Sequence, residues 1–393
     1  MTTTATKTDS DTPPTWDLAD LFKGLDDPEI DKALSSRNGD SASFQKEFAG
    51  KLASLSGAAF GAAIARYEDI LEGAFKVMSY AQLLHAADTA NQEIAQFHQS
   101  CQERVNGITG TLLFFTLELN RIEDDVLNEQ LKDPALARYR PWIDAERQAR
   151  PYQLSDDIEQ MLHDKSVTGH AAWTRMFDET MSELRFPFDG KSLPVGDILN
   201  HMTSADAAVR ERAGRGVAEG LTSRIRLFSL VTNTIAKDKE IEDTKRNFPR
   251  PMSARNIANQ VEDDVVDALS TAVTSNYGRL SHRYYALKAR WFSVDQLNWW
   301  DRNAPFPKTP ERTYSWDQAR ETVLSAYDGF APEMAKTAEQ FFDDRWIDAS
   351  PRAGKNSGAF AHPVVPSAHP YVLMNFYGKP RDVMTLAHEL GHG

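Results

Sequence analysis

The sequence predicts a mainly α-helical fold with a small β element close to its C-terminal end. Apolar residues recur at spacings of three and four throughout 94–122, which describes one helix face sustained for about eight turns. A similar pattern covers 60–85, and the polar residues 87–91 between the two have the composition of a turn. Two short segments, 355–360 and 370–376, have the length and composition of strands. These observations predict an antiparallel helical hairpin and, much later, a pair of short strands.

The other elements follow in order along the chain. Residues 1–15 are rich in Thr, Asp and Pro, which predicts a disordered tail, and 16–22 form a short apolar anchor. Helical patterns then cover 42–125, 156–163, 171–183, 206–239, 261–292 and 315–342.

The segment 186–195 interrupts the helical pattern. Asp189-Gly190 lies between two short apolar runs, which predicts a small hairpin. We place a domain boundary here, between an N-terminal helical domain at 16–195 and a second region at 196–393.

Composition excludes several classes of protein. The chain has 393 residues, 41% of them hydrophobic, and a net charge of −13 from 57 acidic and 44 basic side chains. Such acidity argues against a nucleic-acid partner or an anionic membrane surface. The single cysteine, Cys101, lies on the apolar stripe and is predicted to be a buried thiol. No secretory signal and no run of 18 apolar residues occurs, so we expect a cytoplasmic location.

His388-Glu389-Leu390-Gly391-His392 matches the zinc-peptidase pattern H-E-x-x-H. On a helix, His388 and His392 lie on one face and can bind one metal ion, while Glu389 lies about 100° round the axis, within reach of a metal-bound water. The alternative is a helix with two incidental histidines, since the pattern arises by chance in roughly 1–2% of chains of this length. The local sequence favours a metal-binding helix. Pro380 and Asp382, the predicted N-cap, mark its start, and its apolar stripe comprises Val383, Leu386, Ala387 and Leu390.

The strand pair before this helix has two interpretations. An exposed strand edge can hydrogen-bond an extended peptide and hold it across a metal ion. Alternatively, the strands only close the domain. His362 and His369, in the loop between the strands, either touch substrate or are solvated loop residues, and the second reading is favoured.

Four segments carry a resemblance to a known family: 16–22 (Trp-Asp-Leu-Ala-Asp-Leu-Phe), 357–360 (Ser-Gly-Ala-Phe), 370–376 (Pro-Tyr-Val-Leu-Met-Asn-Phe) and 382–393 (Asp-Val-Met-Thr-Leu-Ala-His-Glu-Leu-Gly-His-Gly). They resemble oligoendopeptidase F, in the M3B branch of the M3 family of zinc metallopeptidases. The resemblance implies a helical, zincin-like ellipsoid with an internal channel that admits short unfolded oligopeptides. It also implies a metalloendopeptidase activity on their internal bonds.

The resemblance further implies roles for individual residues. His388 and His392 would bind one Zn²⁺ per chain, Glu389 would be the general base, and Gly358, Ala359 and Phe360 would contact the substrate backbone. In the family, a third ligand (a Glu on the next helix) and the His and Tyr oxyanion donors come later, at positions this sequence does not contain. We therefore expect an incomplete catalytic domain with its C-terminal part missing, weak or absent activity, and exposed apolar stripes that promote association.

Two rival readings remain. The motif also fits the opening of a metzincin protease, although metzincins are typically secreted and place the motif after a mostly β/α domain. In the other reading the chain is a non-catalytic helical scaffold or an inert fragment. No G-x-G-x-x-G before a helix, P-loop or G-x-S-x-G occurs, so nothing supports a nucleotide-binding or serine-hydrolase reading.

Overall fold

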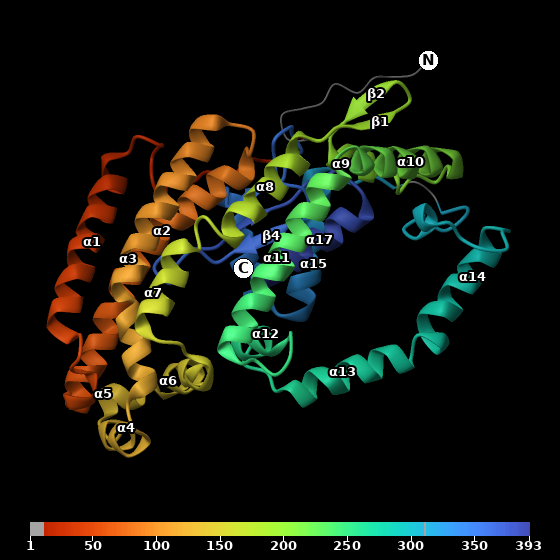
Figure 1. The fold of residues 1–393 in the computed structure, drawn as a ribbon. Coiled ribbons are helices and arrows are strands. Elements are labelled where there is room, and N and C mark those ends of the chain that lie inside the picture. The colour runs from red at the N-terminus through yellow and green to blue at the C-terminus, as the bar shows by residue number, and fades with distance from the viewer. Residues whose placement is uncertain (1–11, 310–311) are drawn as a thin grey trace.

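The fold is known from a computed structural model that describes residues 12–309 and 312–393. Its elements are mainly helices, with one two-stranded and one three-stranded sheet, which confirms the predicted fold class (Figure 1). No helix in these ranges combines the length and the apolar character needed to cross a bilayer.

A bundle of six helices forms the N-terminal part (Figure 1). They are α1 (Pro28–Phe48), α2 (Gly57–Ala87), α3 (Gln92–Arg121), α4 (Asp124–Gln130), α5 (Pro134–Ala137) and α6 (Arg140–Arg147). The predicted hairpin is α2–α3, and the Asn91 side chain caps α3 by accepting from the N–H groups of Glu93 and Ile94. Cys101 is buried in this bundle, as predicted, and burial raises the pKa of its thiol to about 11.

The middle of the chain adds five helices and the small hairpin. These are α7 (Asp156–Lys165), α8 (His170–Glu183), β1 (Phe186–Phe188), β2 (Lys191–Leu193), α9 (Val195–His201), α10 (Ala207–Ser223) and α11 (Ile225–Arg246). The predicted Asp189-Gly190 turn is present with both φ angles positive, at 48° and 76°. The predicted helix 206–239 is two helices, because the chain bends at Arg224.

The next stretch contains α12 (Ser253–Ala258), which lies at the end of α11, and then α13 (Asp263–Ser275) and α14 (Arg283–Trp291), which leave the body as an arm (Figure 1). The predicted helical region 261–292 is confirmed, with a π-helical segment, Gly278–His282, between α13 and α14. α13 has no buried residue, and its apolar side chains stay exposed.

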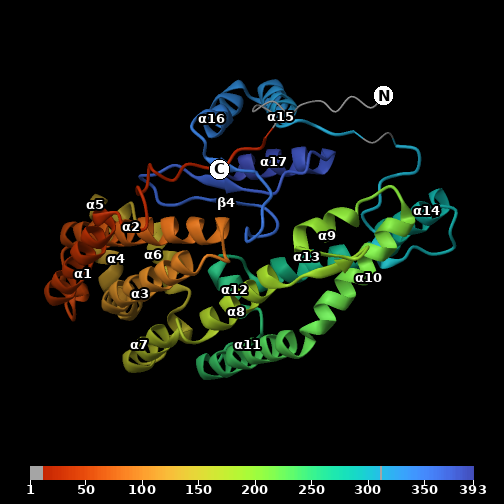
Figure 2. The ribbon, with the colours of Figure 1, turned by 90° about the horizontal axis from the view of Figure 1, so that it is seen from above.

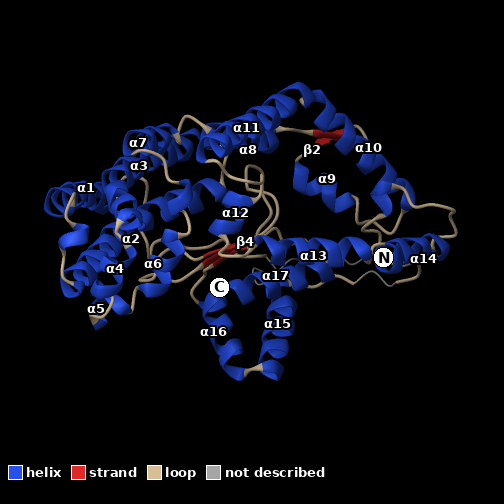
Figure 3. Cartoon of the chain, turned by 60° about the horizontal axis from the view of Figure 1, so that its bottom comes forward, coloured by secondary structure: helices blue, strands red, loops and turns tan. Residues whose placement is uncertain are grey.

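The last third contains α15 (Trp316–Phe330), α16 (Pro332–Asp343), β3 (Ile347–Asp348), β4 (Phe360–His362), β5 (Tyr371–Leu373) and α17 (Pro380–His392). α15 and α16 form a hairpin that projects from the body, and α17 lies beside the sheet (Figures 2 and 3). The sheet order is β3-β5-β4, with β3 parallel and β4 antiparallel to β5. The predicted strand 355–360 was misplaced, because pairing begins only at Phe360 and 355–359 is a loop.

The central strand β5 joins two hydrophobic cores. Tyr371 and Leu373 belong to the core formed with the N-terminal bundle, whereas Val372 and Met374 belong to the core of α15, α16 and α17. Since successive side chains of a strand point to opposite faces, each face of the sheet is covered by helices. A third, smaller core contains Phe186 and Ala213 and therefore uses residues from both sides of position 195, so the domain boundary stays a prediction.

The N-terminal tail is shorter than predicted. The Pro14 carbonyl accepts hydrogen bonds from the N–H groups of Ala349 and Ser350, and the Thr15 carbonyl accepts one from Arg345. Residues 1–11 lie outside the described part of the chain.

Candidate active site

Helix α17, which carries the H-E-x-x-H motif, is capped by Lys379 and not by Asp382 as the sequence predicted. Asp382 lies three residues further on, and its carboxylate accepts hydrogen bonds from the N–H groups of Tyr377 and Lys379 at 2.8 and 2.9 Å. This is the back-reaching half of a capping box, and Pro380 has no N–H to leave unpaired. An acidic residue near the start of a helix can occupy either the N-cap or the N3 position, and the sequence alone does not distinguish the two. Asp382 was therefore assigned to the N-cap position although it lies at N3.

One face of α17 anchors the motif. Val383, Leu386 and Leu390 are buried in the core shared with α15 and α16, as their spacing predicted. The Tyr327 hydroxyl donates a hydrogen bond to the Ala387 carbonyl and so ties α15 to the turn before the motif. The position of the motif helix is therefore set by core packing and by one side-chain hydrogen bond.

His388 and His392 converge on the exposed side of α17. Their Nε2 atoms are 3.1 Å apart, and their rings stand nearly perpendicular at 89°. Two nitrogen ligands on a tetrahedral zinc, with bonds of about 2.0–2.1 Å, lie about 3.3–3.4 Å apart. The spacing also suits a hydrogen bond between two neutral imidazoles of opposite tautomer. The pair therefore fits two ligand positions without any rearrangement of the backbone.

A third protein ligand does not join them. Within residues 12–309 and 312–393, no group of three or more His, Cys, Asp or Glu side chains is arranged to hold a metal ion. The described residues thus supply two imidazoles, fewer than the three protein ligands usual at a catalytic zinc.

Glu389 lies between the two histidines in sequence but turns inward. It is 8% exposed and lines a cavity of about 660 Å³. No hydrogen bond or ion pair links its carboxylate to another described residue. A carboxylate that is unpaired and open to a cavity is available to exchange a proton with a bound molecule.

The cavity brings two of the three predicted substrate-contact residues close to Glu389. Gly358 and Ala359 line it together with Ser357, and Gly358 adopts φ +89°, a conformation that favours glycine. Phe360 instead begins β4 and packs against the core of the N-terminal bundle. β3 and β4 end the sheet, so the outer edge of the predicted strand pair is β4, whose three residues are half-buried, and substrate binding at this edge stays a prediction.

The loop before β4 is fixed by two side chains that the sequence reasoning missed. The Lys355 ammonium is fully buried and donates to Asp348 Oδ1 and the Met374 carbonyl, both at 2.6 Å. The Asn375 amide donates to the carbonyls of Asn356 and Gly358 at 3.0 and 3.2 Å. Burial lowers the pKa of Lys355 to about 8, although Asp348 opposes the shift. These contacts hold the cavity-lining backbone in place.

The opposite wall of the cavity comes from α9 and the residues after it. The Tyr377 hydroxyl donates to Asp197 Oδ1 at 3.3 Å, and burial together with Asp197 raises the pKa of this phenol. Lys379 donates to the Asn200 carbonyl at 3.0 Å and to the Thr203 hydroxyl. No sequence signal links α9 to the motif, because about 180 residues separate them and only the fold brings them together.

The two loop histidines are not solvated loop residues, so the favoured reading was wrong, and contact with substrate stays a prediction. His369 stacks on Trp346, with ring centroids 3.7 Å apart, and its Nε2 lies 3.1 Å from Asp20 Oδ2. His362 lies in β4 with its Nε2 buried and unpaired, and burial lowers its pKa.

The chain is similar to known peptidases. A family model described as "Oligopeptidase F" matches residues 118–186, and one described as "Peptidase family M3" matches 200–393. Oligopeptidase PepF of Bacillus subtilis (strain 168) is 24% identical over 342 residues, covering 83% of this chain and 50% of its own. An oligoendopeptidase F homolog of Borreliella burgdorferi is 23% identical over 390 residues, covering 96% of this chain and 63% of its own.

Solved structures share the fold. PZ peptidase A with an inhibitor superposes with a TM-score of 0.72 at 17% identity, covering 93% of this chain and 62% of that one. Oligoendopeptidase F of Enterococcus faecium gives 0.65 at 21% identity, covering 81% and 60%. The chain thus spans 50–63% of the length of these four proteins.

Proposed function

The chain belongs to the M3 family of peptidases, and from this premise we propose that it carries the metal-binding helix of a zinc-dependent endopeptidase. The substrates would be short, unstructured oligopeptides cut at internal bonds. His388 and His392 would hold one Zn²⁺ per chain, and Glu389 would be the general base. Similarity to family M3 leaves the metzincin alternative without support.

The observation that carries the proposal is the placement of three side chains by one helix. Two imidazole nitrogens converge 3.1 Å apart, and Glu389, the residue after the first histidine, lines a cavity of about 660 Å³. A structural histidine pair would need no unpaired carboxylate facing a cavity beside it, and this arrangement is typical of a functional site.

The chemistry divides between the metal and the chain. A bound zinc ion polarises the scissile carbonyl and lowers the pKa of water. The task of Glu389 is to accept the proton of the attacking water and to pass it to the leaving amine nitrogen.

Substrate binding would use backbone groups more than side chains. The exposed loop Ser357–Gly358 and the free edge of β4 offer hydrogen bonds to an extended peptide lying beside the cavity. Backbone recognition is tolerant of sequence, which suits an enzyme for varied oligopeptides. All residues that line this cavity lie within the proposed second domain, 196–393.

The test is cleavage of a fluorogenic bradykinin-like peptide, measured with and without 1,10-phenanthroline, at enzyme concentrations high enough to detect a slow turnover. We expect chelator-sensitive cleavage, and Glu389→Gln should lower the rate by about 10²–10⁴-fold because it removes the base. Glu219→Gln, an exposed position on α10, is the matched control and should keep the wild-type rate.

Zinc binding separates the outcomes. Glu389→Gln should bind zinc as the wild type does, since the two imidazoles remain. A rate within tenfold of wild type for Glu389→Gln would remove Glu389 as the base. A folded, helical chain that neither binds zinc nor cuts the peptide would favour the non-catalytic scaffold.

A further inference from the structure

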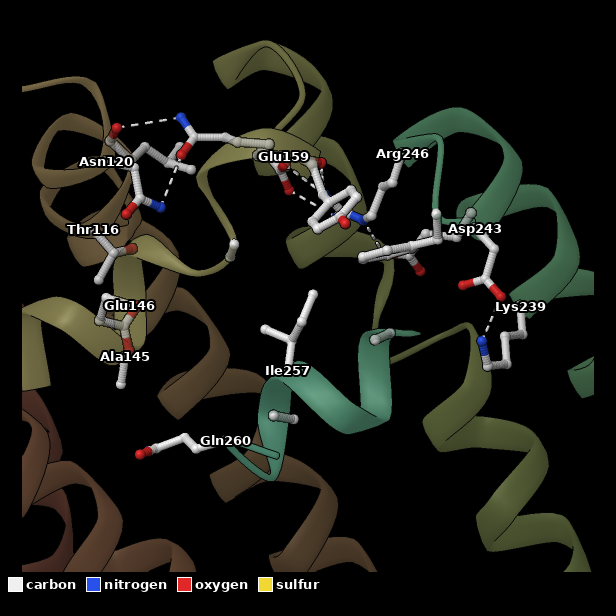
Figure 4. Close-up of a pocket in the computed structure, with 18 residues that line it drawn as sticks. Thr116, Asn120, Ala145, Glu146, Glu159, Lys239, Asp243, Arg246, Ile257 and Gln260 are labelled. Atoms are coloured by element: carbon white, nitrogen blue, oxygen red, sulfur yellow. Dashed lines mark hydrogen bonds and ion pairs between the residues drawn. The ribbon is translucent and has the colours of Figure 1, made fainter. Parts of the chain in front are cut away.

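A second cavity, of about 550 Å³, lies away from the motif helix between the N-terminal bundle and α11–α12. Its walls come from α3, α6, the 3₁₀ turn Arg150–Tyr152, α7, the last turns of α11, and α12 (Figure 4). Much of the lining is apolar: Leu117, Ala145, Ala149, Ala254, Ile257 and Ala258. Ile257 reaches into the middle of the cavity from α12 (Figure 4).

The charged groups on the α11 side of this cavity are already paired. Arg246 forms a two-point ion pair with Glu159, at 2.6 and 2.9 Å, and also binds Glu242 at 2.7 Å. Lys239 pairs with Asp243. Neither base is therefore free to neutralise a further acid on the facing wall.

Glu146, on that facing wall, has no cationic partner. It is partly buried, and no described residue forms a hydrogen bond or an ion pair with its carboxylate. Burial raises the pKa of this carboxyl, and no neighbouring base opposes the shift. Burial, and then the charge of Glu146, raise the pKa of the Tyr67 phenol to about 12. This is the effect expected of a carboxylate whose charge no neighbouring cation compensates.

A second unsatisfied group lies on the same wall. Asn120 is 5% exposed, its amide nitrogen donates to Gln153 Oε1 at 3.0 Å, and its Oδ1 is buried without a partner. Asn120, Thr116 and Glu146 follow one another along this wall (Figure 4). An acceptor buried without a donor costs roughly 1–3 kcal/mol, so the wall gains from any ligand that brings hydrogen-bond donors.

We propose that this cavity binds an organic cation, a primary ammonium or guanidinium on an apolar stem, with the charge against Glu146 and donors toward Asn120. The apolar lining suits a stem of several methylenes, as in a basic side chain of a peptide or a free alkylamine. The site is separate from the candidate active site and does not depend on the proposed peptidase activity.

The opposite charge is excluded by the same groups. An anion would meet the Glu146 carboxylate without a free base nearby, because Arg246 and Lys239 are committed to their own acids. A neutral ligand with the same stem would bury similar apolar area but would leave Glu146 unpaired. Charge, more than shape, should therefore decide which ligands bind.

The test is calorimetric titration of the full chain with three probes: acetyl-Gly-Lys-Gly-amide, the matching norleucine tripeptide, and butylammonium. We expect the lysine peptide to bind at least tenfold more tightly than the norleucine peptide. Glu146→Gln should abolish this preference, because it removes the charge and keeps the shape. Asp144→Asn, an exposed acid on the same helix that does not line the cavity, is the matched control and should keep the wild-type preference.

A second variant guards against an effect on folding. Ile257→Trp fills the cavity from α12 without changing any charge, and it should also abolish binding of the lysine peptide. Butylammonium binding as tightly as the lysine peptide would assign the site to free amines, and weaker binding would assign it to peptide side chains. Equal affinity for the lysine and norleucine peptides, or an unchanged preference in Glu146→Gln, would overturn the proposal.

Discussion

Lys355 shows how a single buried cation supports the candidate site. Its ammonium is enclosed by Asp348 and by three carbonyls, from Asp348, Ser350 and Met374. Arg352 holds the same carboxylate with two further hydrogen bonds at 2.7 Å. The ammonium thereby joins β3, the end of β5 and the loop that lines the cavity.

Lys355→Met should destabilise the protein by about 2–4 kcal/mol, because it leaves the buried Met374 carbonyl without a donor and takes one donor from the Asp348 carboxylate, while Arg352 still neutralises Asp348. Urea unfolding followed by circular dichroism measures the loss. Lys336→Met, an exposed lysine on α16, should change stability by less than about 0.5 kcal/mol. Equal stability of the two variants would show that the buried network contributes little.

His388→Ala and His392→Ala should each weaken zinc binding at least tenfold, because each removes one of the two converging ligands. Calorimetry should give a wild-type dissociation constant weaker than about 1 μM, since the described residues supply only two imidazoles. His170→Ala, at an exposed position at the start of α8, is the control. Sub-micromolar 1:1 binding by the wild type would mean that a third group completes the site.

At the scale of elements, the hairpin α2–α3 contains a stacked histidine pair, His85 and His98, with ring centroids 4.9 Å apart. Burial, and then the charges of His85 and Arg175, lower the pKa of His98 from 6.5 to about 4. Below pH 6.5 the unfolded chain therefore binds more protons at this site than the folded one. The contribution of His98 to the free energy of unfolding is therefore complete above pH 6.5 and is lost as the pH falls toward 4.

His98→Gln should flatten this dependence, because glutamine does not titrate and can still bond to Gln82. We expect the wild type to lose about 1–2 kcal/mol more than the variant between pH 6.5 and 4, after allowance for solvent screening at this partly exposed ring. Urea unfolding at a series of pH values measures the slope. Parallel slopes would contradict the assignment to His98.

The contact between α10 and the hairpin β1–β2 depends on glycine. A Cβ at Gly216 would lie 2.2 Å from the Pro187 carbonyl oxygen, so Gly216→Ala should cost about 1–3 kcal/mol through overpacking. Gly329→Ala in α15 meets nothing within 4 Å and should instead stabilise by about 0.5–1 kcal/mol. Thermal unfolding of both variants measures whether each substitution lowers or raises the stability. A stabilising Gly216→Ala would show that the hairpin β1–β2 shifts to make room for the added methyl group.

At the scale of the molecule, the surface is unusually large. The chain has 23,126 Å² of accessible surface, whereas a compact monomer of its mass has about 15,500 Å². Part of the excess is the arm of α13 and α14, where exposed apolar residues follow a helical spacing: Val265, Leu269, Val273, Tyr277 and Leu280.

We expect the protein to associate as its concentration rises, because this apolar stripe is exposed along its whole length. Sedimentation velocity over a tenfold concentration range measures the change. Leu269→Lys with Val273→Lys should return the protein to monomer, whereas the same two-charge change at the exposed positions Ala218 and Thr222 on α10 should not. A concentration-independent monomer would contradict the expectation.

Local signals carried much of the prediction. The hairpin α2–α3, the turn at Asp189-Gly190 and the apolar face of α17 were found correctly, because each is encoded by residues a few positions apart. The errors arose where local signals are ambiguous or silent. The N-cap of α17 was assigned to Asp382 instead of Lys379, and the strand predicted at 355–360 begins only at Phe360.

The sequence alone therefore determined the motif and the helix that carries it, because periodicity and fixed spacing are properties of neighbouring residues, and the resemblance of four segments indicated the family. Only the tertiary structure decided what lies around Glu389. The walls from α9 and from the loop fixed by Lys355 come from segments about 30–190 residues away, and hydrophobic burial on both faces of β5 brings them together.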